Sequence, residues 1–270
     1  VMFFGWEKIN KKVHLASTWF VAIGSALSAL WILVANAWMQ HPIGMEFNPD
    51  TVRHEMNDFW ALVLNPVAVS KFFHSVFSGW MTGAIFAIGV SCWYLLRKRE
   101  TKFALASIKV SAIVGIIGTF AVMLSGDSSG IHVAKYQPMK LAAAEGLENG
   151  GPRAPFSIVP GVEIPGMLSI LATHDIDGYV PGINDFLDGY TTPDGVRHLS
   201  AEEKMKRGRM AIDAFTKYRM LKDKNPEEAA EARKVLDDNV DYFGYGYIDS
   251  REELVPPVNL VYWAFRVMVG

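Results

Sequence analysis

Three long stretches of this chain contain no Asp, Glu, Lys or Arg. Residues 16–38 are 23 consecutive residues without any of these four types, and residues 72–96 are 25. Residues 110–126 add 17 more, and residues 103–108 extend that run if Lys109 places its ammonium at the membrane surface. About 20 helical residues cross the hydrocarbon core of a bilayer. The sequence therefore predicts three transmembrane helices, because a buried helix of a soluble protein is rarely so long and so free of charge.

The average composition conceals two unlike parts. The chain has 270 residues, of which 50% are hydrophobic, and a formal net charge of −2. Residues 126–256 hold 22 acidic and 15 basic side chains, whereas the rest of the chain holds 6 and 11. So small a net charge argues against a nucleic-acid-binding protein, and one cysteine excludes an internal disulfide. The division predicts a positively charged membrane frame that carries a large acidic insert.

Basic residues beside the apolar runs set the orientation. Lys8, Lys11 and Lys12 precede the first run, and a second basic cluster fills the connection at 97–102. Because cytoplasmic loops are enriched in Lys and Arg, both clusters are expected on the cytoplasmic side. The fold class is then all-α, a polytopic transmembrane helix bundle with a large extracytoplasmic insert. Its expected parts are the tail of a preceding membrane helix (1–6), spans at 13–38, 67–96 and 103–126, an outer connection (39–66), the insert (127–256) and the start of a further span (257–270).

Local signals outside the spans predict shorter elements. Glu55 to Leu64 has the apolar pattern of a helix lying on the membrane surface, and Pro66 marks the start of the next helix or a kink in it. Ser200-Ala-Glu-Glu203 is a capping box that opens a helix to about Leu221. Asn225-Pro226 is a second helix start. Gly and Pro are dense between residues 146 and 193, which predicts mainly loop.

Three side chains in or near the spans could carry chemistry. His74 is the only histidine in the second span, and Met268 lies in the last apolar run. Measured from the outer face along each helix, the two lie roughly 12 Å and 16 Å deep, so they could ligate one haem iron. A histidine bonded to a neighbouring helix and a methionine in the core are the plainer alternatives. Arg266 requires an anion, either a haem propionate or a carboxylate of the insert.

Other polar residues give weaker signals. Lys140 and Glu145 stand five apart in a segment, 137–145, that suits a short helix, and two solvated charges are the simplest expectation for them. Asp127 lies at the expected membrane boundary. Ser28 and Asn36, two turns apart in the first span, could bond to another helix or line a proton path. The sequence contains no P-loop, dinucleotide-binding turn, zinc-protease motif or Ser-His-Asp pattern.

Five stretches together resemble subunit I of cytochrome bd-type quinol oxidases, namely 28–40, 64–68, 71–74, 140–145 and 265–269. The resemblance implies that His74 and Met268 are the axial ligands of a low-spin b-type haem and that Arg266 lies beside it. It implies that Lys140, Glu145 and Asp127 serve quinol oxidation on the extracytoplasmic Q-loop, which is the insert at 127–256. Asn36 and Ser28 resemble polar residues of the route that brings protons to the oxygen-reducing haems.

The same resemblance implies an electrogenic quinol:oxygen oxidoreductase in a bacterial or archaeal plasma (inner) membrane. Ubiquinol or menaquinol would be the substrate. Subunit II would be a partner, a small single-helix subunit is a further candidate partner, and the protein would be surrounded by membrane lipid. A high-spin haem b and a haem d are expected in the intact subunit. Their ligands lie outside residues 1–270, so this chain is expected to be the central part of a longer one, without the oxygen-reducing site.

Two other classes of protein remain open at this stage. A transporter or channel scaffold would also explain the spans and Arg266, and it predicts a central cluster of polar residues with no haem absorbance. A non-catalytic subunit that docks a partner through the insert would explain the acidic loop. It predicts that Lys140 and Glu145 are dispensable.

Overall fold

The computed structural model describes residues 5, 8–159 and 161–269, without the side chain of Val269. Most of the predicted tail at 1–6 lies outside the described residues. The chain forms two compact units. Residues 1–46 and 56–132 make up the helical unit, and residues 47–55 and 133–270 make up the insert unit.

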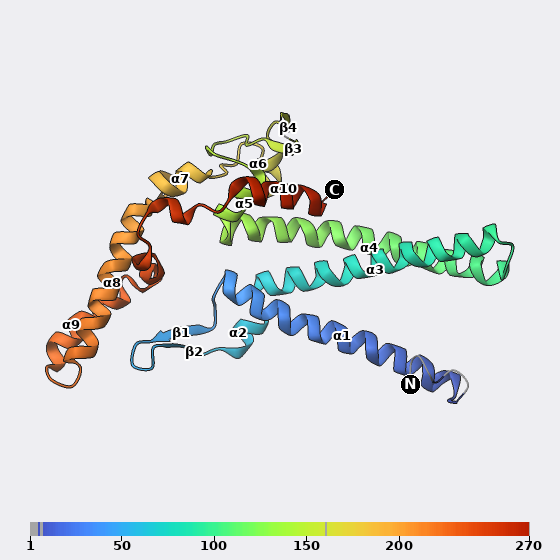
Figure 1. Ribbon diagram of the computed structural model, residues 1–270, viewed down its shortest axis with the longest axis horizontal. Coiled ribbons are helices and arrows are strands. Elements are labelled where there is room, and N and C mark those ends of the chain that lie inside the picture. Colours follow the sequence, from blue (N-terminus) through green and yellow to red (C-terminus); the bar gives the residue numbers. More distant parts are fainter. Residues whose placement is uncertain (1–4, 6–7, 160, 270) are drawn as a thin grey trace. The chain divides into compact units, whose positions relative to one another are not determined.

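Long helices dominate the helical unit: α1 (Lys11–Gln40), α3 (Pro66–Leu96) and α4 (Thr101–Tyr136), with the short α2 (Phe59–Val63) before α3 (Figure 1). The described residues contain three segments long and apolar enough to cross a membrane, Lys11–Gln40, Phe59–Leu96 and Thr101–Tyr136. The three predicted spans fall on these segments. α4 extends ten residues beyond residue 126, and its last turn belongs to the insert unit.

Local chemistry explains where the long helices begin. The side chain of Asn65 accepts a hydrogen bond from the backbone N–H of Val67, and Pro66 occupies the first helical position. The predicted start at Pro66 is confirmed, because a proline there lacks only an N–H that would have no helical partner. α3 and α4 meet through small residues. A Cβ added to Gly118 would come within 3.3 Å of the backbone nitrogen of Met81.

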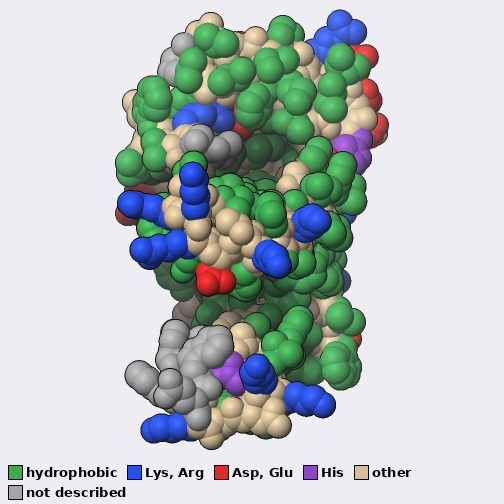
Figure 2. Space-filling view, turned by 90° about the vertical axis from the view of Figure 1, so that its right-hand side faces the viewer, with side chains coloured by type: hydrophobic (Ala, Val, Ile, Leu, Met, Phe, Trp, Pro, Cys, Tyr) green, Lys and Arg blue, Asp and Glu red, His purple; other side chains and the backbone are tan. Residues whose placement is uncertain are grey.

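The surface of the helical unit is apolar along the helices and basic at the α3–α4 turn. No more than 11% of the most apolar window of any span is buried inside the protein, which is what a helix facing lipid or other helices requires. Figure 2 looks onto the α3–α4 turn, where Lys and Arg side chains gather. The exposed basic residues of this turn are Arg97, Lys98, Arg99 and Lys102.

The insert unit is built from short elements. Its α-helices are α5 (Pro138–Glu145), α6 (Met167–Thr173), α7 (Ile183–Asp188), α8 (Ala201–Leu221), α9 (Pro226–Asp237) and α10 (Val258–Val269), joined by the 3₁₀ helices η1 (Val240–Tyr247) and η2 (Arg251–Leu254). Three two-stranded sheets accompany them: β1 (Met45–Asn48) with β2 (Arg53–Met56), β3 (Phe156–Val159) with β4 (Val162–Ile164), and β5 (Tyr190–Thr191) with β6 (Arg197–His198). The pairs β3–β4 and β5–β6 are antiparallel. The region 146–193, predicted as mainly loop, therefore carries several short elements.

The capping box at Ser200 is confirmed. Its side chain accepts from the N–H of Glu203, whose carboxylate accepts from the N–H of Ser200, and α8 runs to Leu221 as predicted. α9 begins at Pro226 with Asn225 before it, although the Asn225 side chain donates to Glu228 instead of capping the helix. α8 packs against α9 and η1. Gly208 allows this, because a Cβ there would overlap the backbone of η1 at Tyr242 and Gly246.

The predicted surface helix at Glu55–Leu64 is wrong in its first part. Glu55 and Met56 belong to β2, and only Phe59–Val63 is helical. The Glu55 carboxylate accepts from Asn48 Nδ2 at 3.0 Å and from Thr51 Oγ1 at 2.8 Å, which favours a hairpin. This hairpin, residues 47–55, packs in the insert unit, where Phe47 contacts the rings of Phe215 and Phe243 and Asp50 pairs with Lys222 at 2.8 Å.

Candidate functional site

His74 lies on α3 against a part of α4 that has small side chains. Its Nδ1 is 3.4 Å from Ser125 Oγ, a long contact for a hydrogen bond. A Cβ added to Gly126 would come within 3.3 Å of His74 Cε1, so a larger residue there would press on the ring. Among residues 8–159 and 161–269, no hydrogen bond to Nε2 occurs. This nitrogen has the donor chemistry of an axial haem ligand.

Arg266 on α10 forms an ion pair with Glu145 at the end of α5. Its Nη2 is 2.7 Å from one carboxylate oxygen, and Nη1 is 3.5 Å from the other. Both side chains are buried, at 10% and 3% exposed. The guanidinium also lies 5.2 Å from the ring of Phe156, 4.7 Å from that of Tyr262 and 5.3 Å from that of Phe265. Of the two anions considered for Arg266, the structure provides the carboxylate of the insert.

This pair changes the interpretation of Lys140 and Glu145. Lys140 is exposed, as expected of a solvated charge. The same expectation is wrong for Glu145, because α10 packs on α5 and covers it. The two residues also face different surroundings: Lys140 lines a cavity of about 530 Å³, and Glu145 is not among the residues that line it.

Arg266 retains a hydrogen-bond donor after binding Glu145. Its Nε is buried and has no hydrogen-bond partner among the described residues. Met268, two residues later, is 74% exposed. Because successive helical residues turn by about 100°, Met268 lies on nearly the opposite side of α10 from Arg266. The exposed thioether of Met268 has the chemistry of a ligand for haem iron.

The remaining predicted residues lie in the helical unit. Asp127, on α4, and Ser28, on α1, are exposed. Asn36 is half-buried and bonds between helices: its Oδ1 accepts from Lys71 Nζ on α3 and from Gln40 Nε2, each at 3.0 Å. Lys71 Nζ also lies 2.5 Å from Gln40 Oε1. Sequence reasoning did not select Lys71, although its position three residues before His74 was a signal.

Comparison with known proteins identifies the family. A family model described as cytochrome bd terminal oxidase subunit I matches residues 1–270. The chain belongs to this family.

Individual relatives agree with the family match. The chain is 39% identical over 300 residues to "Cytochrome bd-II ubiquinol oxidase subunit 1" of Escherichia coli (strain K12), a match covering 100% of this chain and 55% of that protein. It is 32% identical over 279 residues to "Cytochrome bd ubiquinol oxidase subunit 1" of Bacillus subtilis (strain 168), covering 99% and 47%. The chain thus spans about half the length of the curated relatives it matches.

A solved structure shows the same fold. The bd oxidase from Geobacillus thermodenitrificans aligns with a TM-score of 0.57 at 24% identity, covering 99% of this chain and 69% of that one. The predicted family and the predicted polytopic helical membrane fold are confirmed. The roles of His74, Met268, Arg266, Lys140, Glu145, Asp127, Ser28 and Asn36 stay predictions.

Proposed function

We propose that this chain forms the quinol-oxidising part of subunit I of a bd-type terminal oxidase. In this proposal quinol is oxidised at the outer face of a bacterial or archaeal plasma (inner) membrane, and its electrons pass through a low-spin b-type haem towards reduction of oxygen to water. The observation that carries the proposal is the buried pair of Glu145 and Arg266. It joins a carboxylate suited to proton chemistry to the helix that bears Met268, in a chain whose whole length matches the family.

The position of the hairpin 47–55 supports the proposed topology. The hairpin comes from the connection between α1 and α3, and it packs against α8 of the insert through Phe47 and Phe215. Two soluble segments in direct contact must lie on the same side of a membrane. The basic α3–α4 turn then belongs to the other side, which the positive-inside rule makes the cytoplasm. Residues 127–256 are accordingly proposed to be extracytoplasmic.

Quinol oxidation releases two protons and two electrons. Glu145, Lys140 and Asp127 are proposed to serve this step, with Glu145 as an acceptor of a proton, which is general-base work. The guanidinium of Arg266 holds the Glu145 carboxylate in place and, with three aromatic rings around it, excludes water from the pair. Protons that leave to the outside while oxygen takes up cytoplasmic protons would generate a proton-motive force without a pump.

The chain is proposed to hold a low-spin b-type haem. His74 and Met268 are its proposed iron ligands, and Arg266 is proposed to lie beside it. When bound, the haem supplies a one-electron acceptor for quinol. Asn36 and Ser28 are proposed to belong to the proton route. The high-spin haem b, haem d, subunit II and a small single-helix subunit would complete the intact oxidase.

A reduced-minus-oxidised absorption spectrum of the full-length oxidase tests the proposal. His74→Ala should abolish the low-spin b-type band, because the iron loses its imidazole ligand. The exposed His54 on β2 gives the matched control, since His54→Ala removes an imidazole from the hairpin and should leave the spectrum as it is. An unchanged spectrum in His74→Ala would reject the ligand assignment.

A further inference from the structure

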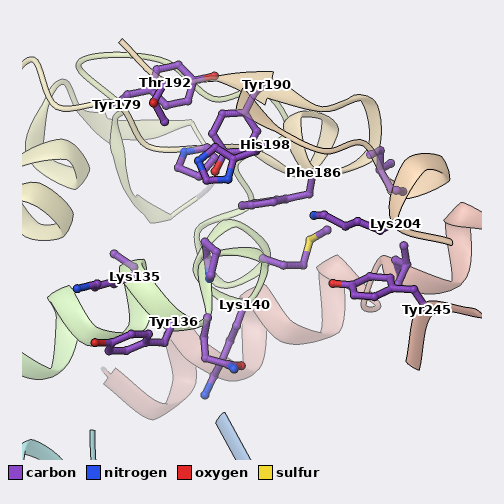
Figure 3. A pocket seen from close by; sticks show the side chains of 18 residues that line it. Lys135, Tyr136, Lys140, Tyr179, Phe186, Tyr190, Thr192, His198, Lys204 and Tyr245 are labelled. Atoms are coloured by element: carbon purple, nitrogen blue, oxygen red, sulfur yellow. The ribbon is translucent and has the colours of Figure 1, made fainter. Parts of the chain in front are cut away.

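A cavity of about 530 Å³ lies beside Lys140 in the insert unit, and the proposed roles leave it unexplained. Its floor is the end of α4 and the start of α5, residues 134–140. Its walls come from α7, β5, β6, the start of α8 and η1, as Figure 3 shows. The volume falls in the range of sites for small organic ligands.

One wall of the cavity is a stack of aromatic rings. Tyr190 lies between Tyr179, at 5.8 Å and 16°, and His198, at 4.4 Å and 10°. Phe186 meets Tyr190 edge-on at 5.8 Å. Antiparallel pairing places Tyr190 directly opposite His198, so the backbone fixes the stack. Burial, together with the charge of Asp185, raises the pKa of both tyrosines, that of Tyr179 to about 12, so both stay neutral phenols.

The charged groups that line the cavity are all basic. They are Lys135, Lys140 and Lys204, and no Asp or Glu is among the described lining residues. Lys135 lies 5.3 Å from the ring of Tyr136, and Lys140 is exposed. In Figure 3 the ammonium of Lys204 extends towards Phe186, whereas that of Lys140 points away from it.

Lys204 is the lysine best placed to bind a ligand. Burial lowers the pKa of its ammonium. Among the described residues, the ammonium of Lys204 has one electrostatic contact, the Tyr245 ring at 5.9 Å, and makes no hydrogen bond or ion pair. A half-buried ammonium without such a partner favours a ligand that brings an acceptor oxygen or a negative charge.

We propose that this cavity binds the aromatic head group of the quinol and that Lys204 donates a hydrogen bond to one ring oxygen. Flat aromatic walls suit a planar ring, and a lysine suits an oxygen that becomes negative as its hydroxyl loses a proton. The inference rests on the proposed quinol oxidation. Lys140, which lines the cavity, and Glu145 are separated by roughly 7.5 Å along α5. Lys204 thus positions the ring, whereas Glu145, which does not line the cavity, keeps only the proton role proposed above.

Steady-state kinetics of the full-length oxidase with a short-chain quinol test the inference. Lys204→Met should raise KM about tenfold or more, because the lost hydrogen bond is to a charged group, while the low-spin haem spectrum stays unchanged. Lys204→Arg should recover much of the affinity, since it keeps a charged donor. Lys217, exposed on the same helix and absent from the cavity lining, gives the matched control: Lys217→Met should leave KM as it is.

Binding of a short-chain quinone to the oxidised enzyme, measured by calorimetry, gives a readout that is independent of turnover. Lys204→Met should weaken this binding, and Tyr190→Leu should weaken it too by removing the middle ring of the stack. If Lys204→Met loses the haem spectrum, Lys204→Gln decides the same question with a shorter polar side chain.

The outcomes separate the two proposals. A wild-type oxidase that does not oxidise quinol would reject the proposed function. Wild-type turnover with an unchanged KM and unchanged quinone binding in the Lys204 variants would overturn the present inference alone. Inhibition by inorganic phosphate that depends on Lys204, with an unchanged KM for quinol, would also overturn it and would assign the cavity to anions.

Discussion

Loss of the Glu145 carboxylate should destabilise the insert unit strongly. The Glu145–Arg266 pair is 90% or more buried on both sides, with one contact of 2.7 Å. Removing one partner of a buried pair costs about 3–5 kcal/mol, because the other charge stays desolvated. The aromatic rings around Arg266 contact it in both proteins, so their cation–π energy cancels in the comparison. We therefore expect a loss of about 3–5 kcal/mol.

A double-mutant cycle isolates the interaction within the pair. Glu145→Gln, Arg266→Gln and the double variant are compared by thermal unfolding of the full-length oxidase, followed by circular dichroism. Since the double variant leaves no uncompensated charge, it should be more stable than the sum of the single changes predicts, with a coupling energy of about 1–3 kcal/mol. Glu148→Gln, at an exposed carboxylate three residues later, is the control and should change little.

Quinol turnover adds a second readout for the same variants. Glu145→Gln should slow turnover while haem content stays intact, because the carboxylate is proposed to accept a proton. Additive effects in the cycle, together with wild-type stability of Glu145→Gln, would refute the reasoning that this pair joins α5 to α10. Loss of all haem in Glu145→Gln would instead assign Glu145 a purely structural role.

Three further predictions concern contacts within each unit. Gly208→Ala should cost about 1–3 kcal/mol because its methyl group would overlap η1; Gly244→Ala, which meets open space, is the control in thermal unfolding. Hydrogen bonds from Lys222 and, to a smaller extent, Tyr218 hold the pKa of Asp50 below its ordinary value. The stability that the Asp50 carboxylate contributes is therefore present above a pH of about 3.9 and is lost as the pH falls through the lowered pKa. Thermal unfolding of Asp50→Asn should therefore show less loss of stability on acidification than wild type, and equal slopes would contradict this. Gly126→Val should shift the low-spin haem band by pressing on the proposed histidine ligand, whereas an unshifted band would place the haem elsewhere.

Sequence reasoning found the long helices because their signal is local. A run without charge such as 72–96 needs no knowledge of the rest of the chain, and the start at Pro66 follows from the chemistry of one residue. The hairpin at 47–55 was missed because an apolar pattern does not reveal hydrogen bonds from Asn48 and Thr51 to Glu55.

The candidate site was harder to predict because its contacts join distant residues. Arg266 and Glu145 are 121 positions apart, so either of two anions could be proposed for Arg266 until α10 was placed on α5. Lys204 was passed over for a different reason. It lies in a helix rich in charge, and only the position of that helix beside Tyr190 and His198 distinguishes it from its exposed neighbours.

The contact between the hairpin 47–55 and α8 also imposes an order on biosynthesis. Asp50 and its partner Tyr218 are separated by 168 residues. At a translation rate of about 5–20 residues per second, the hairpin waits roughly 10–30 s before that part of α8 is made. During this interval α3 and α4 can enter the membrane while Phe47 has no aromatic partners from the insert. The ribosome thus completes α3 and α4 before Phe215 and Phe243 are made, and the cluster of Phe47, Phe215 and Phe243 forms only after η1 has been synthesised.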